Sequence, residues 1–244
     1  MLEWIWTEKN GISFITVPEW AQQGIDVAFT GRWGGTSTGS FNSLNMGLHV
    51  GDSKDLVLEN RRRLMKVFNH DINDMVCCQQ VHGNQVVRVT ARDKGCGSSD
   101  LGSCVAGADG MVTNQSGLYM AAFYADCIPV FLFDPIKRCI GIVHSGWKGT
   151  MGRIPAYAIT VLNQEFGSSR TDIQAFIGPG IGPCCFEVQY DLALKANSEF
   201  GQFHDIISKD KNDCYKWDLP LTIYNILICS GLKSDNIAMA KLCT

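Results

Sequence analysis

Four clusters of glycine divide this sequence, and an apolar run of strand-like composition lies next to each of them. The clusters fall at residues 31–51, 95–110, 141–152 and 178–182. Glycine at such points permits the tight turns that join neighbouring strands. The pattern therefore predicts a sheet with glycine-rich connections. A chain of 244 residues can bury roughly 70% of its unfolded surface, so it needs no disulfide or metal merely to fold.

The apolar runs and their flanking residues predict interleaved strands and helices. We expect helices at residues 52–69, with Asp52 as the N-cap, and at 150–166, 190–200 and 219–230. We expect strands at residues 12–17, 25–30, 76–80, 85–89, 111–113, 118–124, 130–133, 139–143 and 173–177. Their irregular order favours a mixed sheet covered by helices over a doubly wound parallel sheet. No repeat or linker interrupts residues 1–244, which are predicted to form one domain.

Charge and hydropathy argue against nucleic-acid and membrane partners. The net charge is −3 and the isoelectric point is near 5.9, whereas a nucleic-acid-binding protein usually carries a basic face. The most apolar stretch, 117–133, contains Asp126 and is shorter than the roughly 20 apolar residues of a spanning helix.

Eleven cysteines, with no C-x-x-C spacing and no export signal, predict mostly free thiols in a reducing, cytoplasmic compartment.

Three side chains that can bind a metal stand where predicted strands end. His82 lies in Gln-Val-His-Gly, Cys127 in Ala-Asp-Cys-Ile-Pro, and His144 in Val-His-Ser-Gly-Trp-Lys-Gly. Two imidazoles and one thiolate suit Zn²⁺ and leave a fourth position for water or substrate, which is the catalytic arrangement. Their spacings match no compact ligand motif, and the same residues also fit a buried, inert thiol and two histidines bonded to the backbone.

Two further features suggest anion binding. Segment 30–51 is rich in Gly, Ser, Thr and Asn, whose N–H and hydroxyl groups suit an anion or a sugar. It lacks the Gly-Lys-Ser/Thr ending of a nucleotide-binding loop, and a surface loop is the alternative interpretation. Helical steps through Val57, Arg61, Leu64 and Phe68 place Arg61 on an apolar stripe. An inward arginine needs a partner, and a phosphate or a carboxylate fits its fork. The alternative is an internal salt bridge, or a residue at the edge of the stripe whose charged end reaches solvent.

Eight motifs, in order from about residue 25 to the end, resemble the YfiH-type laccase-domain family. Members are also called polyphenol oxidase-like proteins and are regarded as purine nucleoside phosphorylases. The motifs are Thr-Gly-Arg-Trp-Gly-Gly-Thr-Ser (30–37), Ser-Leu-Asn-Met-Gly-Leu-His-Val-Gly-Asp (43–52), Glu-Asn-Arg (59–61), Gln-Gln-Val-His-Gly (79–83), Ala-Asp-Gly (108–110), Ala-Asp-Cys-Ile-Pro (125–129), His-Ser-Gly-Trp-Lys-Gly (144–149) and Ile-Gly-Pro-Gly-Ile-Gly-Pro-Cys-Cys-Phe-Glu-Val (177–188).

The resemblance implies a single-domain α+β fold of the CNF/YfiH type, with a mixed β-sheet layered with helices. It implies bound zinc on His82, Cys127 and His144, which also form the catalytic set. Asn45 and Arg61 match positions that line the substrate or phosphate pocket. The implied activity is phosphorolysis of adenosine, inosine, guanosine and methylthioadenosine, with adenosine deamination as a second activity. The implied partners are therefore a purine nucleoside and phosphate, and the sequence leaves open a monomer or a dimer.

Three other functions remain open. A metal-free cysteine hydrolase or deamidase would use Cys127 as the nucleophile and His144 as its base. A copper-dependent polyphenol oxidase is implied by the older family name, although five histidines are few for several copper ions. A metal-stabilised binding protein would use the same three ligands without turnover. For a deaminase, Asp126 is the candidate general acid or base, and a hydrogen-bond acceptor at the strand end is its alternative role.

Overall fold

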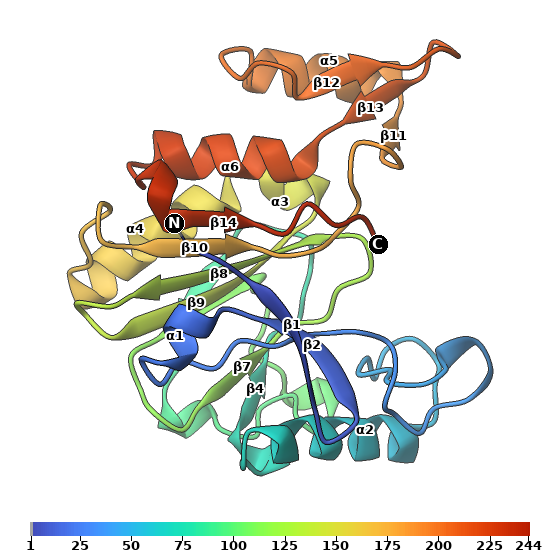
Figure 1. The fold of residues 1–244 in the computed structure, drawn as a ribbon, viewed down its shortest axis with the longest axis vertical. Coiled ribbons are helices and arrows are strands. Elements are labelled where there is room, and N and C mark those ends of the chain that lie inside the picture. Colours follow the sequence, from blue (N-terminus) through green and yellow to red (C-terminus); the bar gives the residue numbers. More distant parts are fainter. Residues whose placement is uncertain (1) are drawn as a thin grey trace.

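A six-stranded mixed sheet forms the centre of the protein (Figure 1), and the computed structural model describes residues 2–244. In spatial order its strands are β14 (Ile237–Met239), β10 (Gln174–Ile177), β8 (Ile128–Asp134), β9 (Cys139–Ser145), β6 (Gly110–Thr113) and β5 (Val86–Arg88). The four inner strands pair antiparallel, and the two outer strands run parallel to their neighbours. The predicted mixed sheet is therefore present.

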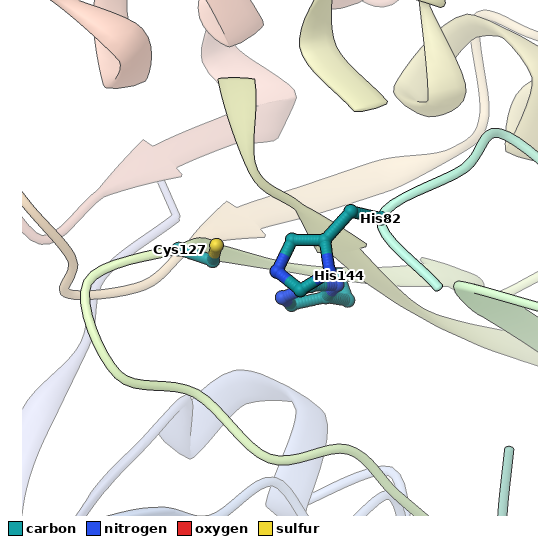
Figure 2. Close-up of side chains that lie close together, drawn as sticks. All are labelled: His82, Cys127 and His144. Carbon is teal, nitrogen blue, oxygen red and sulfur yellow. The ribbon is translucent and has the colours of Figure 1, made fainter. Parts of the chain in front are cut away.

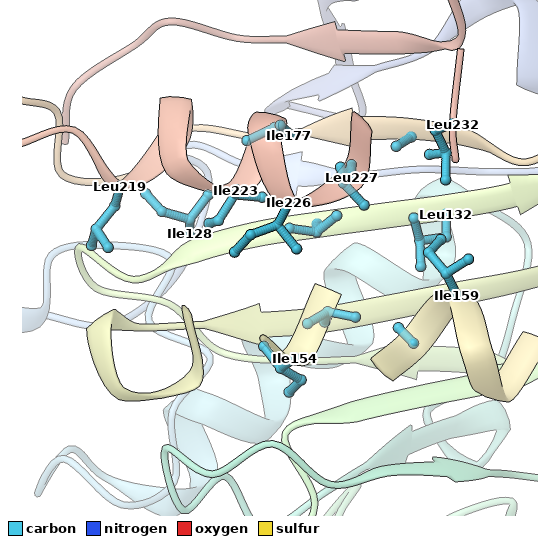
Figure 3. Close-up of a cluster of buried hydrophobic side chains, with 14 of the residues drawn as sticks. Ile128, Leu132, Ile154, Ile159, Ile177, Leu219, Ile223, Ile226, Leu227 and Leu232 are labelled. Carbon is cyan, nitrogen blue, oxygen red and sulfur yellow. The ribbon is translucent and has the colours of Figure 1, made fainter. Parts of the chain in front are cut away.

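Helices cover one face of this sheet. Helices α4 (Ile154–Phe166) and α6 (Leu219–Cys229) pack on it, beside the short α3 (Trp147–Met151). Figure 3 shows their apolar side chains meeting those of the central strands. Ile154, Ile223 and Leu227 are among the fully buried members of this cluster. Burial of such side chains stabilises the fold by roughly 1.5–3 kcal/mol each.

The other face carries the N-terminal segment. A three-stranded sheet of β1 (Ile5–Lys9), β2 (Ile12–Thr16) and β3 (Phe29–Thr30) lies there with α1 (Pro18–Ala21). Trp20 on α1 packs edge-on against Phe133 of the central sheet, with 5.6 Å between ring centroids. Its indole N–H donates to the Gln174 side chain at 2.6 Å, which satisfies the polar atom of a buried ring.

The remaining elements lie around this core. Helix α2 (Lys54–Val67) lies near the parallel pair β4 (Met75–Cys77) and β7 (Tyr119–Ala121). A separate layer is formed by α5 (Tyr190–Glu199) and the sheet of β11 (Glu187–Val188), β13 (Tyr215–Trp217) and β12 (Ile207–Lys209). Single 3₁₀ turns span Gly39–Phe41, Ile72–Asp74, Ala91–Asp93, Leu101–Ser103 and Ser234–Asn236.

Several expected boundaries are wrong. Helix α2 begins at Lys54 after Ser53, and Asp52 is not its N-cap. The Asp52 carboxylate instead accepts hydrogen bonds from Ser37 Oγ at 2.7 Å and Asn45 Nδ2 at 2.9 Å, so it holds the preceding loop. The expected helix 150–166 is two helices, because Arg153 is left-handed (φ 54°) and interrupts the helical backbone. Strand 25–30 shortens to β3, and strand 118–124 to β7.

Within residues 2–244, no helix combines the length and the apolar character needed to span a bilayer.

Candidate metal centre

His82, Cys127 and His144 come together at one end of the central sheet (Figure 2). One donor atom from each lies within 4.8 Å of the others. Figure 2 shows the sulfur of Cys127 facing the two imidazole rings. His82 is exposed, Cys127 is half-buried and His144 is buried, so the centre opens toward solvent on the His82 side. The three residues, separated in sequence by 45 and 17 positions, thus share one site, as predicted from the sequence.

The pairing of β8 with β9 brings the thiol beside the second imidazole. Ile128 is opposite Ser145 and Pro129 is opposite His144, so Cys127 lies just beyond the start of β8, next to Gly146. A Cβ atom at Gly146 would lie only 2.7 Å from Cys127 Sγ. Glycine is therefore required here for space, and it allows the sulfur to lie against the backbone that follows His144.

Asp109 organises both histidines. Its carboxylate accepts the backbone N–H groups of Val81 at 3.2 Å, His82 at 2.9 Å and Gly83 at 2.7 Å. It also lies 2.9 Å from Nδ1 of His144. The Asp109 side chain is fully buried. Since an ionised carboxylate only accepts hydrogen bonds, Nδ1 of His144 carries a proton. Nε2 is the nitrogen that would bind a metal, in exchange for any proton of its own.

The electrostatics of the pair follow from these contacts. Burial disfavours the charged form of His144, but the hydrogen bond to Asp109 and the neighbouring Cys127 outweigh it and raise the His144 pKa to about 9. Burial alone would raise the pKa of Asp109. The hydrogen bonds from His144 and from three backbone N–H groups outweigh this effect and lower the pKa. Asp109 is thus held as a carboxylate behind the imidazole.

The sequence alone does not predict this role of Asp109, although the residue lies in the Ala-Asp-Gly motif. The signal for it is weak, because the carboxylate acts on a turn 26–28 residues before it and on a ring 35 residues after it. The pairing of β6 with β5 brings the turn to Asp109, and the pairing of β6 with β9 brings the ring to it. The left-handed backbone of His82 (φ 58°) is held by the same carboxylate.

A cavity of about 1190 Å³ borders the centre. Its lining includes Tyr124 and Asp126, and it includes none of the three donors. The Tyr124 ring lies 5.6 Å from the His144 ring, and its hydroxyl donates to the carbonyl of Val143 at 3.1 Å. The cavity therefore reaches the centre through Tyr124 and the loop that carries Cys127.

Asn45 lines this cavity, and its amide is used within its own loop. Nδ2 donates to Asp52 at 2.9 Å, and Oδ1 accepts the N–H of Gly47 at 3.0 Å. The loop around it is fixed by buried Asn60, which bonds the backbone of Thr36 at 2.8 Å and of Asn45 at 2.9 Å. Several polar groups of segment 30–51 thus form hydrogen bonds within the protein. Substrate binding by Asn45 stays a prediction.

Arg61 is fully buried and does not line the cavity. Its guanidinium donates to the carbonyls of Met46 at 2.9 Å and of Gly97 and Ser98 at 2.7 Å each. It also lies 4.6 Å from the ring centroid of Phe123, which does line the cavity. Among the described residues, Arg61 therefore forms neither an internal salt bridge nor a solvent-facing edge of the stripe, and it supports the cavity wall from behind. Contact with a ligand stays a prediction.

Asp126 has a left-handed backbone (φ 75°) directly before Cys127. Its carbonyl accepts the N–H of Ile181 at 2.7 Å, and its carboxylate accepts the hydroxyl of Thr244 at 3.0 Å. These contacts agree with the role of a hydrogen-bond acceptor at the strand end, while its place in the cavity lining keeps it beside the centre.

The three donors differ from the other possible metal ligands in the described part of the chain. In residues 2–244 the other group of converging metal donors is Cys184, Cys185 and Cys243, which contains no histidine. Of the remaining histidines, His70 bonds Asp74 at 3.2 Å and His49 packs 6.5 Å from Phe123. Imidazole nitrogen and thiolate sulfur are the donors that zinc prefers, and a carboxylate behind one imidazole is the usual support. The residues present therefore fit a zinc ion.

Known proteins resemble this chain along most of its length. Residues 26–244 match the family described as multi-copper polyphenol oxidoreductase laccase. Purine nucleoside phosphorylase YlmD of Bacillus subtilis is 35% identical over 238 residues, covering 95% of this chain and 85% of that protein. Adenosine deaminase RL5 of an unknown prokaryotic organism is 26% identical over 223 residues, covering 91% and 85%.

The fold is shared as well. The crystal structure of the hypothetical protein YfiH of Bacillus licheniformis superposes with a TM-score of 0.91 at 31% identity, covering 98% of this chain and 88% of that one. Both the predicted α+β fold and the resemblance to YfiH-type proteins are confirmed.

Proposed function

We propose that this chain, which belongs to the family described as multi-copper polyphenol oxidoreductase laccase, is a zinc-dependent purine nucleoside phosphorylase. The observation that carries the proposal is the convergence of His82, Cys127 and His144 beside a large cavity. The 35% identical relative from Bacillus subtilis is named a purine nucleoside phosphorylase, which supports the same reaction here. The proposed substrates are adenosine, inosine, guanosine and methylthioadenosine, together with inorganic phosphate.

Zinc is proposed over copper because of the donor set. Two histidines and a cysteine also form single blue-copper sites, whereas oxidation of phenols by several copper ions requires further imidazole clusters. Within residues 2–244 the trio is the one converging group that contains histidine. A single centre supported by Asp109 suits zinc, and His82, Cys127 and His144 would hold it. There it would act as a Lewis acid and lower the pKa of bound water toward about 7.

In phosphorolysis an oxygen of phosphate bonds to C1′ of the ribose while the bond from C1′ to N9 of the purine breaks. The electron pair of that bond passes to the departing base, whose negative charge must be stabilised. We assign the proton that neutralises the base to Asp126, which borders both the cavity and Cys127. Asp109 keeps the proton on Nδ1 of His144 and fixes the ring, so that Nε2 stays directed at the centre.

Phosphate and nucleoside are assigned to the cavity. Asn45 lies in its wall, and the positive charge of Arg61 lies directly behind the ring of Phe123 in the same wall. That buried charge attracts an anion through the wall, so its proposed effect on phosphate is electrostatic. The aromatic side chains of Phe123 and Tyr124 offer flat apolar surfaces for a purine base.

Adenosine deamination is the second proposed activity, and the 26% identical relative named adenosine deaminase supports it. Here the oxygen of a water molecule bonds to C6 of adenine, the bond from C6 to the exocyclic nitrogen breaks, and ammonia leaves. Asp126 would carry the proton from the water to the leaving nitrogen. A single acid–base residue at the cavity border thus serves both reactions.

The proposal is tested by following inosine consumption with and without added phosphate. We expect hypoxanthine and ribose 1-phosphate to form only when phosphate is present. Cys127→Ala should abolish turnover, and Cys229→Ala, which removes an exposed thiol outside both cysteine-containing groups, should not. Equal turnover without phosphate would show hydrolysis instead. Full turnover of metal-free protein would favour the cysteine hydrolase, and retained turnover in Cys127→Ala with lowered stability would favour a structural metal.

A further inference from the structure

A second group of metal donors lies outside the centre described above. Cys184, Cys185 and Cys243 place their three Sγ atoms within 4.8 Å of one another. All three residues are exposed, so the group is open to solvent. The first two lie in the turn after β10, and the third lies beyond β14, close to 60 residues later in the sequence. The proposed phosphorylase reaction uses none of them.

The backbone holds this group together. Beyond the paired part of β10 and β14, Gly180 forms an isolated parallel bridge with Cys243. The N–H of Gly180 donates to the carbonyl of Leu242 at 3.4 Å, and the N–H of Thr244 donates to Gly180 at 3.3 Å. The turn carrying the other two cysteines is closed by the N–H of Cys185, which donates to Gly182 at 3.0 Å. The convergence is therefore built by paired main chain.

Gly182 shapes the space between the sulfurs. Its N–H donates to Cys243 Sγ at 3.3 Å, which favours the thiolate form. A Cβ atom at this position would lie 3.5 Å from Cys243 Sγ and 3.6 Å from Cys184 Sγ. These are ordinary van der Waals distances, and they show that both sulfurs lie beside the same backbone position.

We propose that Cys184, Cys185 and Cys243 form a second metal site, which binds a thiophilic cation such as Zn²⁺ or Cu⁺ through three thiolates. Sulfur donors without nitrogen or oxygen select soft cations. With zinc–sulfur bonds of about 2.3 Å, tetrahedral geometry separates two sulfurs by about 3.8 Å, which the 4.8 Å limit of this group accommodates. Binding releases the thiol protons, because each ligand must be deprotonated.

The site is linked to the loop that carries Cys127. The N–H of Ile181, one residue before Gly182, donates to the carbonyl of Asp126 at 2.7 Å. The hydroxyl of Thr244, one residue after Cys243, donates to the Asp126 carboxylate at 3.0 Å. A cation that joins residues 184–185 to residue 243 therefore ties together the two segments that hold Asp126. This inference rests on the chain's own sulfurs and not on the proposed reaction.

The test is a cadmium titration of the full chain, fully reduced and without oxygen, followed by thiolate-to-cadmium absorption. We expect the wild type to bind two cadmium ions with high affinity. Replacing all three cysteines with alanine should leave one ion and remove about three quarters of the absorption, since three of the four ligating thiolates are lost. Cys127→Ala should also bind one ion but keep most of the absorption. Cys229→Ala is the control and should match the wild type.

Because the triple replacement could disturb folding, a single substitution tests the same site. Cys243→Ser, checked for an unchanged circular dichroism spectrum, should lower the affinity of the second ion at least tenfold and leave the first unchanged. One ion in the reduced wild type, with no effect of Cys243→Ser, would overturn the proposal. So would a disulfide among these cysteines in the absence of reductant together with no second ion after reduction. Cys127→Ala should lose the first ion and keep the second. The two proposals, for the His82, Cys127 and His144 centre and for the three-cysteine site, can therefore be contradicted separately.

Discussion

His144 and Asp109 are joined twice. The backbone N–H of His144 donates to the carbonyl of Asp109 at 2.7 Å, and Nδ1 of the same residue lies 2.9 Å from the Asp109 carboxylate. The first bond continues the pairing of β6 with β9, and the second fixes the ring on the strand that carries it. The position and orientation of one candidate metal donor are thus both set by a single residue.

Replacing Asp109 with Asn should weaken the metal centre. An amide oxygen cannot accept all of the four N–H groups that meet the carboxylate, and removing the support of a metal-binding histidine typically lowers metal affinity about 10–100-fold. We expect that loss for Asp109→Asn, measured by competition with a chromophoric chelator. Asp93→Asn, which removes a carboxylate that caps an unrelated turn at Thr90, is the control and should keep wild-type affinity. Equal affinity of the two variants would contradict the role given to Asp109.

Gly146→Ala should disturb the centre through Cys127. The added methyl group would lie 2.7 Å from Cys127 Sγ, so the sulfur must move away from its position opposite the imidazoles. We expect weaker metal binding and lower turnover with little change in the circular dichroism spectrum. Gly31→Ala is the control for metal affinity, because its nearest contact would be an ordinary 3.6 Å. Wild-type zinc affinity in Gly146→Ala would show that the glycine is not needed for space.

Stability should fall in acid partly through Asp74. The hydrogen bond from Lys94 Nζ at 2.7 Å, with help from the backbone of Asp71, lowers the Asp74 pKa to about 2. A carboxyl whose folded pKa lies below its unfolded value stabilises the fold above the unfolded pKa of about 3.9 and loses that contribution as the pH falls toward the folded pKa. Urea unfolding between pH 6 and about pH 2 should therefore show a smaller difference between wild type and Asp74→Asn in acid. A difference that does not change with pH would contradict this.

Leu227→Ala should destabilise the fold without altering the centre. Leu227 is fully buried between α6 and the sheet, and such a change typically lowers the free energy of unfolding by about 2–5 kcal/mol. Leu194→Ala, on α5 with 48% of its surface exposed, should change it by less than about 0.5 kcal/mol. Both are measured by urea unfolding, with metal affinity as the second readout. A similar loss in the two variants would contradict the assigned packing.

The parts of the fold predicted from sequence are those with strong local signals. The apolar strands β8 and β9 and the helices α2, α5 and α6 lie close to their expected ranges, since their hydrophobic pattern and flanking turns are local. The short strands β11, β12 and β13 were not predicted, because pairing between distant segments and not their own composition makes them strands. Nothing tests the assignment of residues 1–244 to one domain, which stays a prediction.

The candidate site likewise contains residues that the sequence could identify and residues that it could not. His82, Cys127 and His144 could be selected because their residue types and strand-end positions are visible in the sequence. Asp109 could not, since its role depends on how β6 lies between β5 and β9. Arg61 was correctly placed on the inward face of α2, but the sequence cannot show that its hydrogen-bond partners are backbone carbonyls.

The most direct test of the account is reconstitution of metal-depleted protein with zinc, with phosphate-dependent loss of inosine followed at each addition. We predict no turnover without metal, recovery in proportion to zinc until the His82, Cys127 and His144 centre is filled, and no recovery in Cys127→Ala. A metal-depleted protein that consumes inosine at the full rate, or recovery with copper but not with zinc, would contradict it.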